Sequence, residues 1–473
     1  MTVHRLILLV SCALLAGSAS ASSQDGLRGQ LLKQPQPPNV LLLIADDLGV
    51  DGVAAYGEQP NPVRTPNIDA LATDGMLFRN CWASPGCSPT RATMLTGQYG
   101  FRTRIGIAIN YDNSGFELDK DSPSLGHVLP DAYRVEALGK WHLSTAAGSH
   151  KRHPSHMGFE NFRGSMKIIK GFIGPGYYEW DKVDQGVESL ETTYATTDTV
   201  DDALEFIDRV GPDQPWFLWT AFHAPHAPYH KPPSQLHTYT LPAEVGDDIP
   251  LIHRAMLEAL DTEIGRLLAS IDPAVLANTV IIFIGDNGTT KQATELPFIP
   301  QHAKNTVFEG GVNVPLIVKG PGVQRGTECG ALVNAVDLFD TIAEVAGVRE
   351  TGSPDSVSLV PYFRNPDRPP LREWVYTEIF APNGNANLTT DRAVRIGDYK
   401  LIYKLDSTKA LVREFLFDLA SDPFELANLV DTPPLDAEAA AAYAELVEVI
   451  EGMVPPFPPP SITTNGWDYG STR

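Results

Sequence analysis

Cysteine is scarce in this chain, which has four cysteines among its 473 residues. Small secreted domains that depend on disulfides carry a far higher proportion, so the composition excludes a fold cross-linked by cysteine pairs. Cys12 lies in an apolar N-terminal stretch, and Cys87 belongs to a motif described below. The remaining two, Cys81 and Cys329, either form one disulfide or stay as two buried thiols.

Basic residues are outnumbered, with 36 Lys and Arg against 58 Asp and Glu, which gives a formal net charge of -22. A protein that binds nucleic acid needs a basic face for the phosphates, so we expect no nucleic acid partner. The overall field of the protein does not attract an anionic substrate either. Any anion that binds must therefore be held by local positive groups.

Long hydrophobic runs are absent as well. The run from Leu6 to Ala16 is shorter than the roughly 20 residues that span a membrane, so we expect no stable membrane insertion. It precedes the small-residue cleavage site Ala19-Ser20-Ala21, and we therefore expect residues 1–21 to be a signal peptide of an exported protein, periplasmic or secreted. The box Leu9-Val10-Ser11-Cys12 weakly resembles a lipoprotein cleavage site, which leaves anchoring at Cys12 as the second alternative.

The length favours one large core with a smaller unit beside it. Charged residues make up 20% and hydrophobic residues 43% of the chain, as in soluble globular proteins. We expect a flexible lead-in over residues 22–37, a large domain over 38–365, a C-terminal α+β subdomain over 366–455 and a Pro-rich tail over 456–473. Within this division, the segment from Pro361 to Pro370 is predicted to be a linker.

Two apolar runs end in carboxylates. Asn39–Ala45 precedes Asp46-Asp47, and Thr279–Gly285 precedes Asp286-Asn287. Unbroken apolar runs of this length are typical of buried parallel strands, whose carboxyl ends meet at the edge where α/β sheets bind ligands. Three carboxylates and an amide oxygen suit Ca²⁺ or Mg²⁺. The alternative is that these Asp side chains only cap the helices that follow.

The segment from Cys87 to Gly97 is predicted to begin a helix. Gly86 allows the chain to bend, and Pro89 suits the first helical turn. Cys87 would then lie at the helix N-terminus, where the dipole and free N–H groups favour an anion. Arg91 lies four residues on and projects from the same face. This arrangement fits a site for a tetrahedral oxyanion.

Other polar residues follow predicted strands. Lys140 and His142 are two residues apart and would share one face of an extended segment. His226 lies in a Pro-rich turn after the apolar strand that begins at Pro215. His223 and His230 lie in the same turn and are expected to be loop or supporting residues outside catalysis.

The sequence Cys-Ser-Pro-Thr-Arg-Ala-Thr-Met-Leu-Thr-Gly resembles the sulfatase signature, C-x-P-x-R followed by x-x-x-L-T-G. Further segments that resemble this family occur in the expected order over residues 38–430: Gly139-Lys140-Trp141-His142, Pro225-His226-Ala227-Pro228, Lys304 to Pro315 and Leu416 to Leu429. Asn313 stands where the family usually has Arg. The resemblance implies an α/β fold of the alkaline phosphatase type, with a large mixed, mostly parallel sheet flanked by helices and a smaller C-terminal antiparallel sheet.

The resemblance also implies the chemistry of the site. A formylglycine-generating enzyme would oxidise Cys87 to an aldehyde, whose hydrate attacks sulfur with one hydroxyl and expels sulfate when the other loses its proton. The implied catalytic residues are Cys87, Arg91, Lys140, His142, His226 and Lys304. The implied ligands of one divalent cation, Ca²⁺ before Mg²⁺, are Asp46, Asp47, Cys87, Asp286 and Asn287.

The implied function is hydrolysis of a sulfate monoester, aryl or carbohydrate, to an alcohol and sulfate, with a sulfated glycan among the candidate substrates. One alternative is a formylglycine-dependent phosphonate monoester or phosphodiester hydrolase. Another is a catalytically silent, exported carbohydrate-binding protein. Loops 101–115 and 164–180 are expected to set specificity, where Tyr177, Tyr178 and Trp180 either stack on a substrate ring or only pack.

Overall fold

The computed structural model describes residues 37–453, apart from 113–114, 387–388, 407 and 409. The predicted signal peptide, the lipoprotein alternative at Cys12, the lead-in up to residue 36 and the tail lie outside the described residues. None of the helices in the described part is both long and apolar enough to cross a membrane.

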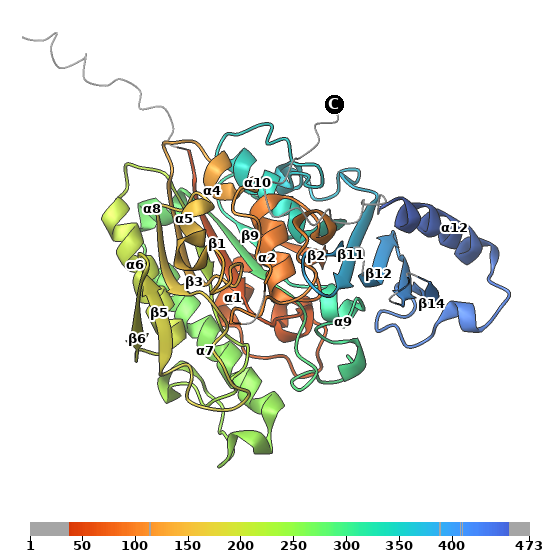
Figure 1. Ribbon diagram of the computed structural model, residues 1–473, viewed down its shortest axis with the longest axis horizontal. Helices are drawn as coiled ribbons and strands as arrows, with labels where there is room; N and C mark the ends of the chain where they lie inside the picture. Colours follow the sequence, from red (N-terminus) through yellow and green to blue (C-terminus); the bar gives the residue numbers. More distant parts are fainter. Residues whose placement is uncertain (1–36, 113–114, 387–388, 407, 409, 454–473) are drawn as a thin grey trace, which may run out of the picture. The chain divides into compact units, whose positions relative to one another are not determined.

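The first apolar run forms a central strand of a ten-stranded sheet (Figure 1). The strand order is β10-β2-β9-β8-β1-β7-β3-β4-β5-β6. The middle of the sheet is parallel, since β1 pairs in parallel with β7 and β8, and β3 with β7 and β4. Strand β9 and the edge pair β5–β6 run antiparallel to their neighbours, which confirms the predicted mixed α/β sheet. The strands are β1 Asn39–Ala45, β2 Met76–Trp82, β3 Arg134–Lys140, β4 Asn161–Ser165, β5 Trp180–Asp184, β6 Val187–Glu191, β7 Trp216–Ala221, β8 Thr279–Gly285, β9 Leu316–Lys319 and β10 Thr327–Asn334.

Strand β1 is buried on both faces. Leu42 and Ile44 belong to one hydrophobic cluster, whereas Leu41 and Leu43 belong to another on the opposite face. Burying each such side chain contributes roughly 1.5–3 kcal/mol, so helices must cover both faces. The first cluster includes residues of α2 Cys87–Thr96, α4 Leu125–Val128, α10 Leu338–Val345 and α11 Val360–Arg364. The second includes residues of α1 Pro66–Thr73, α6 Ala195–Val210, α7 Ile249–Ser270 and α8 Pro273–Ala277.

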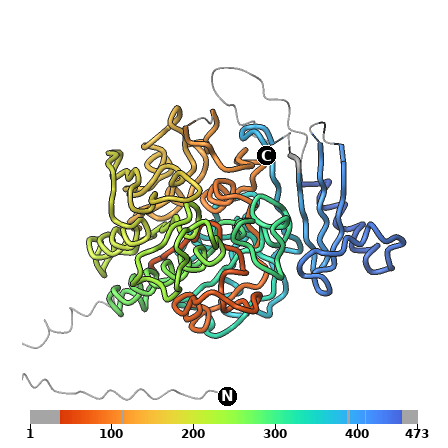
Figure 2. The backbone as a smooth tube through the Cα atoms, turned by 90° about the horizontal axis from the view of Figure 1, so that it is seen from below, coloured from red at the N-terminus to blue at the C-terminus, as the bar shows by residue number. Residues whose placement is uncertain are grey.

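A second sheet of four antiparallel strands follows in the order β11-β12-β13-β14, and its blue strands run side by side in Figure 2. Its strands are β11 Trp374–Phe380, β12 Thr389–Ile396, β13 Tyr399–Leu405 and β14 Leu411–Asp418. The pair Gly397-Asp398 connects β12 to β13, and Gly397 has φ 54°, as the predicted hairpin requires. Helix α12, Ala437–Gly452, packs Leu446 and Ile450 against this sheet.

The predicted linker from Pro361 to Pro370 is wrong in its first half. Pro361 lies inside α11, and Tyr362 and Phe363 are buried in the core of the large sheet. The prolines suggested an exposed connection, but the two aromatic rings bury enough apolar surface to anchor the segment.

The two remaining cysteines are free thiols and both are buried. Cys81 lies on β2 and Cys329 on the neighbouring β10, where Cys329 is opposite Phe78. The two thiols are therefore three residues out of register, roughly 10 Å along the strands, which is too far for a disulfide. Of the two alternatives for this pair, the structure has the buried thiols.

Candidate active site

The ends of β1 and β8 bring four polar residues together. Because Ala45 pairs with Gly285, the pairs Asp46-Asp47 and Asp286-Asn287 meet at one edge of the sheet, as predicted. Asp47 donates its backbone N–H to Asp286 Oδ1 at 3.0 Å and accepts from Asn287 Nδ2 at 2.8 Å. All four residues are buried.

Helix α2 places Cys87 at this edge. Cys87 is the first residue of the helix, after an extended Gly86, and only 1% of its surface is exposed. Its Sγ lies 3.8 Å from Asp47 Oδ1. Arg91 is one turn further on, donates from Nε and Nη2 to Asp286 Oδ2, and donates from Nη1 to the carbonyl of Lys140. Arg91 therefore joins the ends of β8 and β3 under the helix.

Lys140 ends β3, and its Nζ pairs with Asp46. His142 does not continue the strand, because its φ is 60°. The expectation that Lys140 and His142 share a face of extended chain is therefore wrong. His142 nevertheless reaches the site, where Nε2 lies 2.8 Å from the Ile109 carbonyl and Ser88 Oγ donates to the His142 carbonyl at 2.8 Å.

The tautomer of His142 follows from these contacts. A carbonyl oxygen only accepts, so Nε2 must carry the proton that bonds to Ile109. The lone pair is then on Nδ1, which is buried and has no hydrogen-bond partner among the described residues. Burial lowers the pKa of His142 well below its usual value, and Lys140 and Arg91 lower it further. His142 is thus a neutral base in the site.

His226 lies in the turn after β7, with Nε2 3.6 Å from Asp47 Oδ2. Tyr177 is fully buried and donates its hydroxyl to the His226 carbonyl at 2.8 Å. Trp180 is 4% exposed, and Tyr178 bonds to the Lys231 carbonyl at 2.9 Å. Of the two alternatives for these three aromatic residues, packing fits the structure, and Tyr177 fixes the turn that carries His226.

The other two histidines of this turn are buried in different ways. The centroid of the His223 ring lies 6.3 Å from that of the Tyr177 ring and 6.1 Å from that of the Trp180 ring, and burial lowers its pKa to about 3, with Lys140 contributing in the same direction. His230 lies against the Tyr177 ring, with centroids 4.2 Å apart, and bonds to the Tyr194 hydroxyl at 3.1 Å.

Lys304 completes the group. Its Nζ pairs with Asp47 and lies 3.4 Å from Cys87 Sγ. Its backbone N–H donates to the Thr289 carbonyl at 3.0 Å. Although burial opposes the charge, Asp47 holds the pKa of Lys304 well above its usual value, so the ammonium stays charged.

Charge and burial decide the state of the acidic groups. Burial raises the pKa of the Cys87 thiol to about 12, and Asp46 adds to this, so an unmodified thiol is protonated at neutral pH. Although burial opposes its ionisation, Lys140 holds the pKa of Asp46 well below its usual value. Burial raises the pKa of Asp286 to about 6 and Asp46 adds to this, although Arg91 opposes the shift.

The residues present fit a divalent cation. Asp46 Oδ1, Asp47 Oδ2 and Asn287 Oδ1 are buried and have no hydrogen-bond partner within the described part of the chain. Unpaired buried oxygens are costly, and a hard cation would satisfy all three. Asp46, Asp47, Cys87 and His226 also offer ligand atoms within 4.8 Å of one another. The oxygens of Asp286, the remaining carboxylate of the predicted ligand set, accept from Arg91 and the Asp47 backbone, and its place among the metal ligands stays a prediction.

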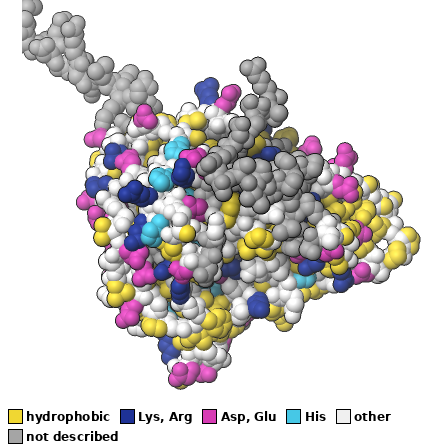
Figure 3. All heavy atoms as spheres, in the orientation of Figure 1, with side chains coloured by type: hydrophobic (Ala, Val, Ile, Leu, Met, Phe, Trp, Pro, Cys, Tyr) yellow, Lys and Arg dark blue, Asp and Glu magenta, His cyan; other side chains and the backbone are white. Residues whose placement is uncertain are grey.

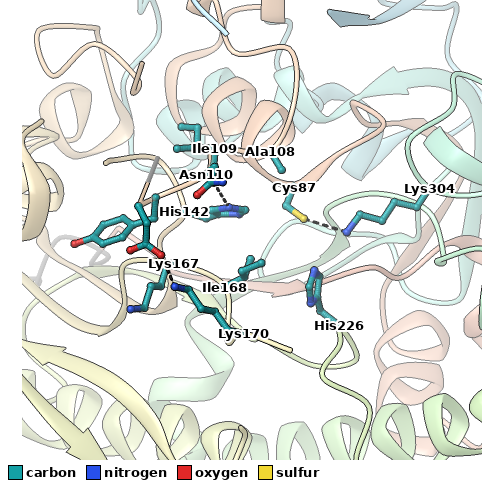
Figure 4. Close-up of a pocket in the computed structure, with 12 residues that line it drawn as sticks. Cys87, Ala108, Ile109, Asn110, His142, Lys167, Ile168, Lys170, His226 and Lys304 are labelled. Carbon is teal, nitrogen blue, oxygen red and sulfur yellow. Dashed lines mark hydrogen bonds and ion pairs between the residues drawn. The ribbon is translucent and has the colours of Figure 1, made fainter. Parts of the chain in front are cut away.

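Cys87 lines a cavity of about 400 Å³ (Figure 4). Its lining comes from the two loops expected to set specificity as well as from the residues above. The twelve lining residues are Cys87, Ala108, Ile109, Asn110, Tyr111, Asp112, His142, Lys167, Ile168, Lys170, His226 and Lys304. The sequence motifs did not single out Lys167 and Lys170, because a lysine in a loop carries no signal of its own there.

Comparison with known proteins agrees with this arrangement. A family model described as Sulfatase matches residues 38–348, and one described as N-sulphoglucosamine sulphohydrolase, C-terminal, matches residues 301–451. The chain is 31% identical over 402 residues to the N-acetylgalactosamine-6-sulfatase of Sus scrofa, covering 77% of this chain and 72% of that relative. It is 29% identical over 483 residues to the choline-sulfatase of Rhizobium meliloti (strain 1021), covering 86% of each.

A solved structure has the same fold. The crystal structure of Ps i-CgsB in complex with k-i-k-neocarrahexaose superimposes with a TM-score of 0.72 at 25% identity. The match covers 88% of this chain and 92% of that one.

Proposed function

Since the chain belongs to the sulfatase family and is a sulfuric ester hydrolase, we propose that it removes sulfate from a carbohydrate with a nucleophile derived from Cys87. The observation that carries the proposal is the position of Cys87 in the lining of the cavity, 3.4 Å from Lys304 Nζ and 3.8 Å from Asp47 Oδ1. Of the two relatives named above, one is an N-acetylgalactosamine-6-sulfatase and the other a choline-sulfatase, and the superimposed structure is a complex with k-i-k-neocarrahexaose. The first relative and this complex favour a sugar as the leaving alcohol.

Cys87 itself is poorly suited to attack sulfur, because its thiol stays protonated. Conversion to formylglycine supplies a hydrated aldehyde, with an oxygen nucleophile and a second hydroxyl on the same carbon, which neither cysteine nor serine has. Since Cys87 is 1% exposed, the maturation enzyme must reach it before the chain folds. We assign that step to a formylglycine-generating enzyme. Because residues 1–21 are expected to be a signal peptide, we also propose that the mature protein lies outside the cytoplasm.

A Ca²⁺ ion is the cation we propose, held by the free oxygens of Asp46, Asp47 and Asn287 next to position 87. When bound, it lowers the pKa of a hydroxyl at that position and offsets the charge of the sulfate. Asp286, the other carboxylate in the predicted ligand set, also accepts from Arg91 at 2.8 Å and so helps to hold this guanidinium at the site.

The chain's own groups then divide the work. Lys304 is charged and close to Cys87, so it can bind a sulfate oxygen and the departing oxygen. Lys140 adds a second positive charge beside Asp46. His226 lines the same cavity and is proposed to protonate the leaving alcohol with Lys304. His142 can take up a proton at Nδ1 from a hydroxyl at position 87.

The test compares rates on nitrophenyl sulfate, a nitrophenyl phosphodiester and a sulfated sugar for the wild-type protein and Cys87→Ala. We expect sulfate esters to be preferred, and the variant to lose at least about a thousandfold in kcat while keeping its melting temperature. Preference for the phosphodiester would favour the phosphodiesterase alternative. Binding of the sugar without turnover by wild-type protein that carries the modification would favour the silent carbohydrate-binding alternative.

A further inference from the structure

The lining of the cavity has the opposite charge balance to the chain. It includes three lysines, Lys167, Lys170 and Lys304, and one carboxylate, Asp112, whereas acidic residues outnumber basic ones in the whole sequence by 58 to 36. On the face shown in Figure 3, basic and acidic side chains are interspersed. Lysines thus outnumber carboxylates among the residues that line the cavity, which favours an anionic ligand on a protein of this net charge.

Lys167 and Lys170 form the wall across the cavity from Lys304 (Figure 4). Both follow β4 in a loop. Lys167 Nζ lies 2.8 Å from Asp181 Oδ2 and 5.8 Å from the centre of the Tyr111 ring. Lys170 pairs with Asp112. These lysines therefore stand apart from the charged cluster of Lys140, Lys304 and Arg91 around Cys87.

Lys167 and Lys170 can each bind a ligand in addition to the carboxylate with which they form an ion pair. The side chains of Asp181 and Asp112 are 46% and 39% exposed, and ion pairs this exposed contribute little to stability. A lysine ammonium has three N–H donors, and each carboxylate engages one face of it. Asp181 is not among the residues that line the cavity, so it leaves the cavity side of Lys167 open to a ligand.

The sulfate that is hydrolysed does not need these lysines. Lys304, Lys140 and Arg91 already surround the position at which it must meet residue 87. The side chains of Lys167 and Lys170 contact Asp181, Tyr111 and Asp112. A second anionic group on the ligand explains two further cations on the opposite wall.

Building on the proposed function, we propose that Lys167 and Lys170 form an anion subsite, and that the substrate is a glycan with a second acidic group near the reacting sulfate. The second group is a sulfate or a carboxylate, since both accept from an ammonium. The Tyr111 hydroxyl bonds to His150 Nδ1, and Lys167 Nζ lies over the Tyr111 ring. The hydrogen bond therefore helps to fix the side chain against which Lys167 packs. Asp112 opposes the second anion and so limits its affinity.

The experiment measures inhibition of nitrophenyl sulfate hydrolysis by three probes. They are N-acetylgalactosamine 6-sulfate, N-acetylgalactosamine 4,6-disulfate, and a disaccharide of a uronic acid with N-acetylgalactosamine 6-sulfate. We expect at least one of the two diacidic probes to bind about tenfold more tightly than the monosulfate, and which one does so distinguishes sulfate from carboxylate. Added salt should reduce this advantage.

The variants Lys167→Gln and Lys170→Gln should each remove much of that advantage while leaving kcat on nitrophenyl sulfate within about twofold of wild type. Asp112→Asn should increase it. Lys319→Gln and Lys120→Gln are matched controls, because these lysines also form single, partly exposed ion pairs, with Asp74 and Asp121, away from the cavity. The controls should change nothing.

Equal binding of all three probes to the wild-type protein would overturn the subsite. So would lysine variants that weaken the monosulfate as much as the diacidic probes. Failure of the proposed function gives a different result, namely no turnover of nitrophenyl sulfate by protein that carries the modification. In that case direct calorimetric titration of the same probes into wild type and Lys167→Gln still decides whether the subsite exists.

Discussion

The ammonium of Lys304 lies 3.4 Å from Cys87 Sγ and at the same time pairs with Asp47. The three residues come from distant parts of the sequence: Asp47 follows β1, Cys87 begins α2, and Lys304 lies in a turn before α9, Glu309–Val312. One cation thus links the position of the nucleophile to the carboxylate that is proposed to bind the metal. A substitution of Lys304 should therefore affect both the nucleophile at position 87 and the carboxylate of Asp47.

Lys304→Ala should lower kcat on a sulfate ester by roughly 10²–10³-fold, because it removes a charge that faces the developing negative charge of the transition state. Lys304→Arg should recover part of the lost kcat, since arginine restores the positive charge but carries it on a planar guanidinium instead of a compact ammonium. Steady-state kinetics on nitrophenyl sulfate measure this, with Lys319→Ala as the control on the same large sheet. If Lys304→Ala changed only KM and left kcat as in the wild type, this would contradict a role of Lys304 in stabilising the transition state.

Metal removal should inactivate the enzyme and destabilise it. Chelation followed by addition of Ca²⁺ at about 100 times its Kd should raise the free energy of unfolding by roughly 2.7 kcal/mol. Asp46→Asn should abolish most of this gain, because Asp46 Oδ1 is one of the three free oxygens. Asp121→Asn, at an exposed carboxylate, is the control.

Thermal melts in the presence of Ca²⁺, Mg²⁺ and chelator give the measurement. The same melting temperature in all three, together with unchanged activity after chelation, would rule out a resident cation at this edge of the sheet. A response to Mg²⁺ alone would replace the proposed ion.

Glu425 should give the stability of the fold a distinct pH dependence. Its carboxylate is buried beside Lys400, whose Nζ lies 2.8 Å from Glu425 and 3.0 Å from Glu309. Burial raises the pKa of Glu425 from 4.5 to about 7, although Lys400 opposes the shift. The folded state therefore holds this proton more tightly, and its contribution to stability is lost as pH rises from about 4.5 to about 7.

Melting temperatures across this range should fall more for the wild type than for Glu425→Gln, which cannot ionise. Glu445→Gln, at an exposed position of α12, should follow the wild type. Parallel pH profiles for wild type and Glu425→Gln would show that Glu425 does not titrate in this window.

Much of the site could be predicted because its residues follow apolar runs or lie at turns, and both features can be recognised in the sequence. The apolar run before Asp46 is a buried strand by pattern alone, and its parallel pairing with β8 brings the two polar pairs together. Cys87 at a helix N-terminus follows from Gly86 and Pro89. The roles of these residues remain predictions.

Other features depended on three-dimensional packing that no local pattern shows. The left-handed φ of His142 is imposed by the turn after β3, and Tyr362 is buried although prolines surround it. Arg91 takes up the carboxylate of Asp286 because the helix and strand meet at that point. Lys167 and Tyr177 lie in a long loop, and the sequence does not predict the conformation of that loop.

The most direct test of this account is a peptide mass spectrum around residue 87 of the protein from its native host. We predict the mass of the formylglycine aldehyde at that position, shifted by reagents that capture aldehydes. An unmodified thiol at Cys87 in fully active protein would contradict the central claim, because the nucleophile would then have to be another group.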